Sequence, residues 1–151
     1  MNKEINLILP NIRSAHNVGA MFRIADCFGV DKIYLTGYTP TPEDKRKVEK
    51  VALGAEKWVE WEKIENVDVL ISDLKNNNFE VVCLENTNDS VDVKKADFTD
   101  KIALIVGEEV SGVNSELLGL CDKSVFIPMH GKKSSLNVSV ATGVALHSII
   151  S

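Results

Sequence analysis

The chain has 151 residues, 44% of them hydrophobic, which suits one compact domain with a single core. Seventeen basic residues against 22 acidic ones give a net charge of −5, so any RNA contact must come from local patches rather than from the average surface. No apolar run has the roughly 20 residues of a membrane span, and no secretory signal precedes the first apolar run. We therefore expect a single cytoplasmic domain over residues 1–151, without a membrane partner.

The chain order of apolar segments predicts the fold class. Short apolar runs that stop at proline, glycine or polar residues predict strands at 5–9, 32–36, 79–84, 102–106 and 125–127. The run from Trp58 to Trp61 alternates like an edge strand, and residues 67–74 have helical periodicity. Strands and helices alternate throughout, which predicts an α/β fold, a mainly parallel sheet flanked by helices with right-handed crossovers.

Capping residues predict where the helices begin and end. Ser14 or Asn17 suits the start of the first helix, which Gly29 ends. Asn114 or Ser115 suits the start of a short helix in the C-terminal half. The charged run 43–50 is typical of a solvated helical face.

The three cysteines are Cys27, Cys83 and Cys121. They are odd in number, far apart in sequence and each next to apolar residues, which indicates reduced thiols in the core. No cysteine or histidine pair has the spacing of metal ligands, so we expect no metal site.

Three polar loops follow apolar strands, at residues 11–17, 107–112 and 129–137. In a parallel sheet such loops lie at the carboxyl edge, where they can converge on one crevice. We expect Ser135, Asn137 and Ser139 in the first turn of the last helix, whose free N–H groups suit a phosphate. Ordinary N-capping explains these small polar residues equally well.

The absence of common motifs excludes several kinds of site at this crevice. Neither G-x-G-x-x-G nor G-x-x-x-x-G-K-[ST] occurs, so the loops are not those of a dinucleotide fold or a phosphate loop. No G-x-S-x-G elbow occurs, and the three histidines lack an obvious partner arrangement for a hydrolase.

Arg23 lies off the apolar stripe of the first helix. Gly19, one turn earlier, carries no side chain and would leave the space beside the guanidinium open. The alternative is an ordinary surface ion pair with Asp26, three residues later.

Three longer motifs occur in order along the chain. Residues 17–23 read N-V-G-A-M-F-R, and Gly107, Glu109 and Gly112 form G-x-E-x-x-G. Residues 127–141 match I-P-M-x-G-x-x-x-S-L-N-V-S-V-A at every fixed position. On these motifs the sequence resembles the SpoU-type (TrmH-like) RNA 2′-O-ribose methyltransferases of the SPOUT, or α/β-knot, superfamily, over nearly the whole chain.

The resemblance implies a SPOUT-type fold with a C-terminal trefoil knot from about residue 107. It implies S-adenosyl-L-methionine as methyl donor and a homodimer whose active sites are completed across the interface. The residues that it implies around the cofactor are Leu84, Gly107, Ile127, Met129 and Leu136. The residues that it implies around the reacting ribose are Asn17, Arg23, Glu109, Ser135 and Asn137.

The family assigns the arginine that Arg23 matches to activation of the 2′-hydroxyl. Because a guanidinium stays protonated at neutral pH, we expect Arg23 to stabilise developing alkoxide charge instead. An apolar face on the last helix, with Val140, Val144, Ala145 and Ile149, fits a dimer contact or burial within one subunit.

The RNA partner has to be inferred separately. We expect no separate RNA-binding domain of the kind that larger relatives have at the N-terminus, and we expect phosphate contacts from Arg13, Arg46, Lys47, Lys132 and Lys133. The resemblance favours tRNA as the substrate. The alternatives are 23S-type rRNA and, from another class of protein, a non-catalytic RNA-binding or assembly factor.

Overall fold

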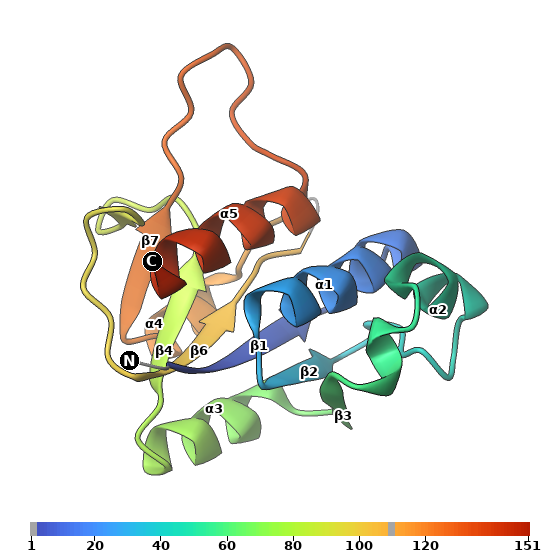
Figure 1. Ribbon diagram of the computed structural model, residues 1–151. Helices are drawn as coiled ribbons and strands as arrows, with labels where there is room; N and C mark the ends of the chain where they lie inside the picture. Colours follow the sequence, from blue (N-terminus) through green and yellow to red (C-terminus); the bar gives the residue numbers. More distant parts are fainter. Residues whose placement is uncertain (1–2, 109–110) are drawn as a thin grey trace.

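The computed structural model describes residues 3–108 and 111–151 (Figure 1). The strands are β1 (Glu4–Pro10), β2 (Lys32–Thr36), β3 (Glu60–Ile64), β4 (Glu80–Leu84), β5 (Val91–Asp92), β6 (Lys101–Ile105) and β7 (Lys123–Phe126). The α-helices are α1 (Ala15–Phe28), α2 (Arg46–Ala52), α3 (Val67–Asn76), α4 (Ser115–Leu120) and α5 (Val138–Ile150), and η1 (Ala55–Lys57) is a 3-10 turn. In the described part of the chain, no helix is long and apolar enough to cross a bilayer.

The strands form one seven-stranded sheet in the order β3-β2-β1-β6-β4-β7-β5, and every neighbouring pair is parallel. The predicted parallel α/β sheet is therefore confirmed. β1 lies between β2 and β6, and its Leu7 is in register with Ile33 on one side and Leu104 on the other. A strand with neighbours and helices on both sides is mostly apolar, which explains the run from Ile5 to Pro10, in which only the buried Asn6 is polar.

Helices cover both faces of the sheet (Figure 1). α1, α2 and α5 lie over one face, while α3 and α4 lie over the other. Because successive side chains of a strand point to opposite faces, Leu7 and Leu9 pack under α1 and α5, and Ile8 packs with Leu74 and Leu117.

Hydrogen bonds at the helix ends confirm most of the predicted caps. The Ser14 hydroxyl accepts the N–H of Asn17 at 3.1 Å, and the Asn114 side chain accepts the N–H of Leu117 at 2.9 Å. Gly29 ends α1 with a φ of 71°, a conformation that favours glycine.

The start of α5 differs from the prediction. The Asn137 Oδ1 accepts the N–H groups of Ser139 at 2.9 Å and Val140 at 3.3 Å, so the helix begins at Val138. Ser135 therefore lies in the loop before the cap and not in the first turn. Two N–H groups that we expected to suit a phosphate are taken by Asn137, so that expectation was wrong.

Gly19 has a different role from the one expected. A Cβ at this position would lie 2.6 Å from the Val48 carbonyl oxygen and 2.7 Å from the Val51 Cβ of α2. The glycine thus allows close packing of α1 on α2, which explains why α1 has no side chain there.

The remaining differences lie at the edges of the domain. β3 begins at Glu60, because Trp58 ends η1, and the two-residue strand β5 was not predicted. Cys83 is buried and Cys121 partly buried, but Cys27 is exposed on α1, so the expectation of three core thiols was wrong for Cys27. A hydrogen bond with Cys121, together with burial, raises the pKa of the Cys83 thiol.

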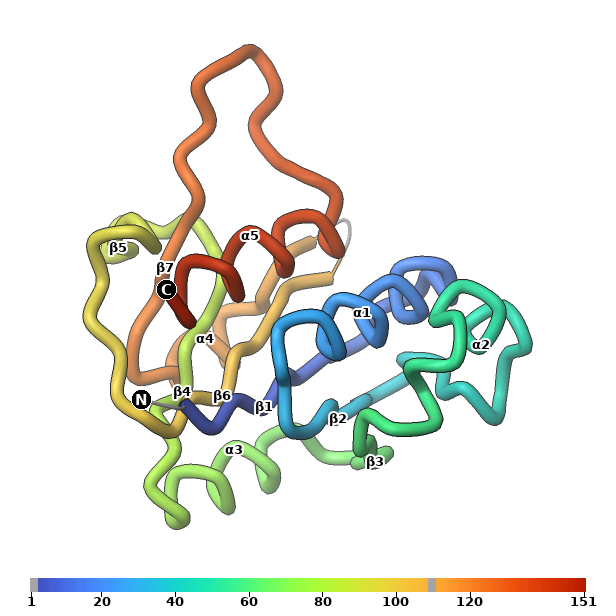
Figure 2. The backbone as a smooth tube through the Cα atoms, viewed as in Figure 1, coloured from blue at the N-terminus to red at the C-terminus, as the bar shows by residue number. Residues whose placement is uncertain are grey.

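The C-terminal third leaves the sheet and returns to it. Figure 2 traces the backbone from β6 through α4 to β7, then up a long protruding loop and back into α5. The trefoil knot implied for this part of the chain stays a prediction.

Candidate active site

A cavity of about 1000 Å³ opens at the carboxyl edge of the sheet. Its walls come from the ends of β4, β6 and β7, from the first turn of α1 and from the loop before α5. All three polar loops identified in the sequence contribute to it, through Asn17, Gly107 and Asn137 among others. The predicted convergence on one crevice is confirmed.

Most of the predicted site residues lie in this cavity. Eight of them line it: Asn17, Leu84, Gly107, Ile127, Met129, Ser135, Leu136 and Asn137. Arg23 does not line it, and Glu109 lies outside the described residues. The structure thus brings together all the residues predicted to hold the cofactor and three of the five predicted around the ribose.

The two asparagines in the cavity are bonded to each other. The Asn137 Nδ2 donates to the Asn17 Oδ1 at 3.2 Å, and Asn17 is only 8% exposed. Because Asn137 also caps α5, this bond ties the start of α5 to the start of α1. Both amides are held at the cavity wall by packing and hydrogen bonds, as a site that orients a ligand requires.

The structure explains why glycine stands at both ends of the G-x-E-x-x-G motif. A Cβ on Gly107 would lie 2.8 Å from the backbone of Gly112, and Gly112 has a φ of 68°. A Cβ on Gly112 would lie 2.3 Å from the Glu85 Oε2. Only glycine fits at either position without moving the backbone or Glu85.

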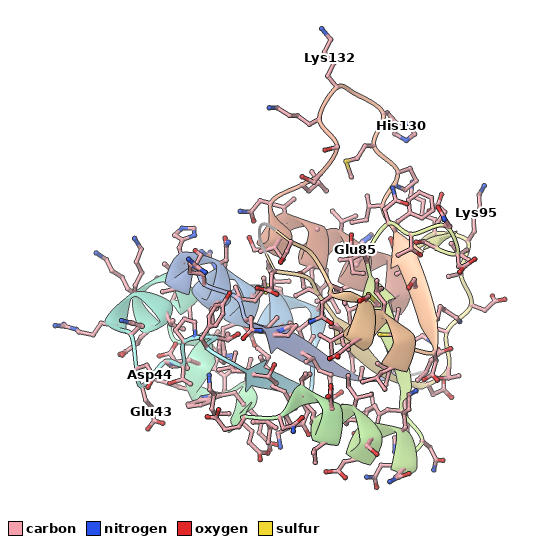
Figure 3. All side chains as sticks on the ribbon, turned by 180° about the vertical axis from the view of Figure 1, so that it is seen from behind. Glu43, Asp44, Glu85, Lys95, His130 and Lys132 are labelled. Carbon is pink, nitrogen blue, oxygen red and sulfur yellow. The ribbon has the colours of Figure 1, made fainter. Side chains whose placement is uncertain are left out.

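Glu85 is a site residue that the sequence did not identify. It follows β4 directly, lines the cavity, and its Oε2 accepts the N–H of Val113 at 2.8 Å (Figure 3). It therefore holds the loop that contains the motif of Gly107 and Gly112. The available signal was its position, a carboxylate at the end of a buried strand.

The contact between Tyr38 and Glu108 beside the cavity was not predicted from the sequence either. The Tyr38 hydroxyl donates to the Glu108 Oε1 at 3.0 Å, and the Arg13 guanidinium carbon lies 5.6 Å from the centre of the Tyr38 ring. Glu108 lines the cavity, so the loop after β2 is linked to the cavity wall. Tyr38 is held in turn by its backbone N–H, which Asn11 Oδ1 accepts at 3.1 Å.

Arg23 lies on the exposed side of α1. The Asp26 Oδ1 accepts the indole N–H of Trp58 at 2.7 Å, and Arg23 forms no ion pair with any described residue, so the expected alternative of an Arg23 to Asp26 pair is not seen. The neighbouring helix α5 exposes Val140 (50%) and Val144 (39%), while Ala145 and Ile149 of the same predicted apolar face are buried.

The predicted RNA-binding residues lie at three places on the surface. Arg46 and Lys47 are exposed in α2. Lys132 stands near the tip of the protruding loop, with Lys133 next to it in sequence (Figure 3). Arg13 is exposed beside Tyr38, close to the cavity.

The fold and the cavity define an α/β domain with a cavity at the carboxyl edge of a parallel sheet, where such domains bind their ligands. A family model described as "SpoU rRNA Methylase family" matches residues 4–147. The chain belongs to this family.

Named relatives include enzymes for two kinds of RNA. The tRNA (guanosine(18)-2′-O)-methyltransferase of Aquifex aeolicus is 35% identical over 145 residues, which span 96% of this chain and 68% of that protein. The Escherichia coli K12 protein of the same name is 28% identical, with 95% and 62% covered. The 23S rRNA (guanosine-2′-O-)-methyltransferase of Haemophilus ducreyi is 34% identical, with 95% and 58% covered.

Solved structures agree with the fold. The TrmH/SpoU tRNA modifying enzyme of A. aeolicus superposes with a TM-score of 0.86 at 33% identity, over 97% of this chain and 74% of that one. An AdoMet-bound rRNA methyltransferase from Sinorhizobium meliloti has a TM-score of 0.86 at 25% identity, with 98% and 56% covered. The expected family and SPOUT-type fold class are thereby confirmed.

Proposed function

We propose that the protein transfers a methyl group from S-adenosylmethionine to a ribose 2′-hydroxyl of tRNA. The observation that carries this proposal is the single cavity in which residues from all three motifs meet, Asn17, Gly107 and Asn137 among them. The relatives named above support ribose methylation as the reaction. Both tRNA and 23S rRNA enzymes occur among them, so rRNA is the alternative substrate.

The cavity fits the cofactor chemically. Leu84, Ile127, Met129 and Leu136 provide apolar surface for an adenine and a methionine chain, and the bare backbone at Gly107 allows close approach. The bound cofactor supplies an electrophilic methyl group on a sulfonium, which needs no Lewis acid. Calorimetry in the presence of a chelator is therefore expected to show S-adenosylmethionine binding, and no binding would remove the enzyme proposal.

The chain's own residues position the ribose and stabilise charge. The reaction needs the 2′-oxygen, the methyl carbon and the sulfur in line, and the amides of Asn17 and Asn137 stand fixed at the cavity to orient the nucleotide, with Ser135 beside them. A guanidinium is a hydrogen-bond donor and not a base, so Arg23 stabilises the developing alkoxide, while an RNA phosphate or water accepts the proton.

The exposed position of Arg23 supports a homodimer. Arg23 does not line the cavity of its own protomer, and the outer side of the adjacent α5 exposes Val140 and Val144. A second copy packed on this surface would cover the two valines. Arg23 of the first protomer would then lie at the cavity of the second. Glu109 would complete the ribose site through its place in the second motif.

The RNA would be held mainly by phosphate contacts. Arg13, Arg46, Lys47, Lys132 and Lys133 are all exposed, and a dimer doubles them into a positive track despite the net charge of −5.

The decisive experiment incubates the protein with labelled methyl donor and separated tRNA and rRNA from methylation-deficient cells, then maps the labelled nucleotide. A labelled tRNA ribose is the expected result, and a labelled 23S ribose favours the alternative. Cofactor binding without transfer to either RNA would support a non-catalytic RNA-binding factor.

A further inference from the structure

A second cavity, of about 960 Å³, lies beside the first turn of α1 and is walled by α2, η1 and the residues that join them. His16 lines this cavity, while its chain neighbour Asn17 lines the candidate active site. Each cavity therefore has a lining residue in the first turn of α1. A ligand as long as an RNA strand can occupy both.

The residues that line this cavity carry an excess of positive charge. Arg46, Lys47, Lys50 and Lys57 line it, and none of them forms an ion pair with any residue in the described part of the chain. Two carboxylates, of Glu49 and Glu56, share the lining, so the cations are in excess. Such a cluster attracts phosphate groups.

The carboxylate of Glu56, a residue that lines this cavity, points to a more specific ligand. The Glu56 Oε1 is buried and has no hydrogen-bond partner among the described residues. An unsatisfied buried acceptor destabilises the fold unless a donor reaches it. A bare phosphate has no donor to offer, but a nucleobase edge carries N–H groups.

An exposed indole lies next to Gly54, one of the residues that line this cavity. Trp58 is 63% exposed, and its ring lies 3.3 Å from where a Cβ on Gly54, a cavity residue, would be. The indole N–H is donated to Asp26 at 2.7 Å, which fixes the ring. Fixed aromatic rings beside cations are the surfaces on which unstacked RNA bases stack.

We propose that this cavity is a second nucleotide subsite, which takes one unstacked guanosine of the RNA next to the reacting nucleotide's site. Its phosphate lies on Lys50 and Lys57, its base stacks on Trp58, and the Glu56 carboxylate turns into the cavity to accept the base N1–H and N2–H groups. Guanine fits because its Watson–Crick edge presents adjacent N–H donors to a carboxylate. The proposal rests on the proposed function, since it takes RNA as the substrate.

The test uses guanosine and inosine 5′-monophosphates, which differ only in the 2-amino group. Each is titrated into the intact protein with saturating S-adenosylhomocysteine in the active-site cavity, and binding is followed by NMR. Guanosine monophosphate is expected to shift the Trp58 indole and Glu56 amide signals. Inosine monophosphate is expected to bind about tenfold more weakly, because one bond to a charged acceptor is lost.

Two variants separate the parts of the subsite. Glu56→Gln is expected to abolish the preference for guanosine monophosphate, while Lys50→Ala with Lys57→Ala weakens both nucleotides equally. Lys95→Ala, near the opposite edge of the sheet, is the control and is expected to change neither (Figure 3).

Equal binding of the two nucleotides to the unaltered protein would overturn the proposal, as would shifts confined to the active-site cavity. This wild-type comparison keeps the test valid if a variant fails to fold. Failure of methyl transfer with guanosine monophosphate still bound here would remove the proposed function and leave the subsite. Methyl transfer to RNA, with no change in the Trp58 and Glu56 signals when guanosine monophosphate is added, would remove the subsite and leave the proposed function.

Discussion

Glu85 and Arg23 have different relations to the candidate active site. Glu85 touches the cavity and fixes its wall through the N–H of Val113. Arg23 lies outside the cavity of its own chain, with a guanidinium that no described residue neutralises by an ion pair. Glu85 therefore acts on local stability, whereas the proposed role of Arg23 concerns only the reaction.

Arg23→Ala is expected to lower methyl transfer about a hundredfold or more, since it removes a donor to developing negative charge. Cofactor affinity, measured by calorimetry, should stay largely unchanged, because the proposed contact of Arg23 is with the ribose and not with the cofactor. Arg23→Lys should also lose most activity, because a point charge cannot reproduce the planar fork of donors. Near-normal turnover in the lysine variant would mean that positive charge alone is required.

Glu85→Ala is expected to destabilise the fold by about 1–3 kcal/mol, because the N–H of Val113 loses its charged acceptor. Denaturant unfolding measures this change. Glu85→Gln keeps an acceptor oxygen and is the matched control, expected to recover much of the loss. Equal stability of the alanine variant and the wild type would show that water replaces the carboxylate.

At the scale of elements, helix α1 organises the face of the sheet that carries both cavities. It contacts α2 through Gly19 and lies beside α5, where Ile24 comes within 3.8 Å of the Cβ position of Gly143. A change in the spacing of these helices would therefore move the first turn of α1, in which His16 and Asn17 line the two cavities.

Gly19→Ala is expected to be destabilising. Alanine favours a helix over glycine by about 0.5–1 kcal/mol, but overpacking against α2 costs about 1–3 kcal/mol. The Cβ would lie 2.6 Å from the Val48 carbonyl oxygen, so the helices must separate. Gly119→Ala in α4, where no atom lies within 4 Å of the new Cβ, is the control and is expected to be stabilising by thermal unfolding.

Helix α2 is expected to be a phosphate-binding element. Replacing Arg46 and Lys47 together with Ala should weaken RNA binding and flatten its salt dependence by about one unit of slope for each phosphate that the variant no longer neutralises. S-adenosylmethionine binding should stay intact, and the double variant Lys94→Ala and Lys95→Ala serves as control. An unchanged slope would mean that this charged run is only a solvated helical face.

At the scale of the whole molecule, the proposed dimer places parts of one site on two chains. Mixing an Arg23→Ala protomer with an Asn137→Asp protomer tests this directly. The aspartate keeps the oxygen that caps α5 but loses the donor to Asn17. Half of freely mixed dimers would be mixed and each would carry one intact site, so about a quarter of wild-type activity is expected from two inactive variants. No recovery after subunit exchange would place Arg23 and Asn137 in the same chain's site.

The strands, helix caps and turns of this protein depend largely on residues that are close together in the sequence. The apolar run of β1, the caps at Ser14 and Asn114, and the turn at Gly29 all depend on near neighbours, and they were predicted correctly. The three motifs identified the family and eight residues of one cavity, because polar loops after parallel strands meet at one edge.

Only the tertiary structure decided the contacts between distant segments. β6 lies between β1 and β4, an order that the sequence does not reveal, and this order brings Glu85 against Gly112. The packing of α2 on α1 likewise explains Gly19 and leaves Arg23 on the outside. Residues that are close in the chain reveal their relation through periodicity, whereas contacts across the sheet depend on strand order and helix packing, which no local pattern encodes.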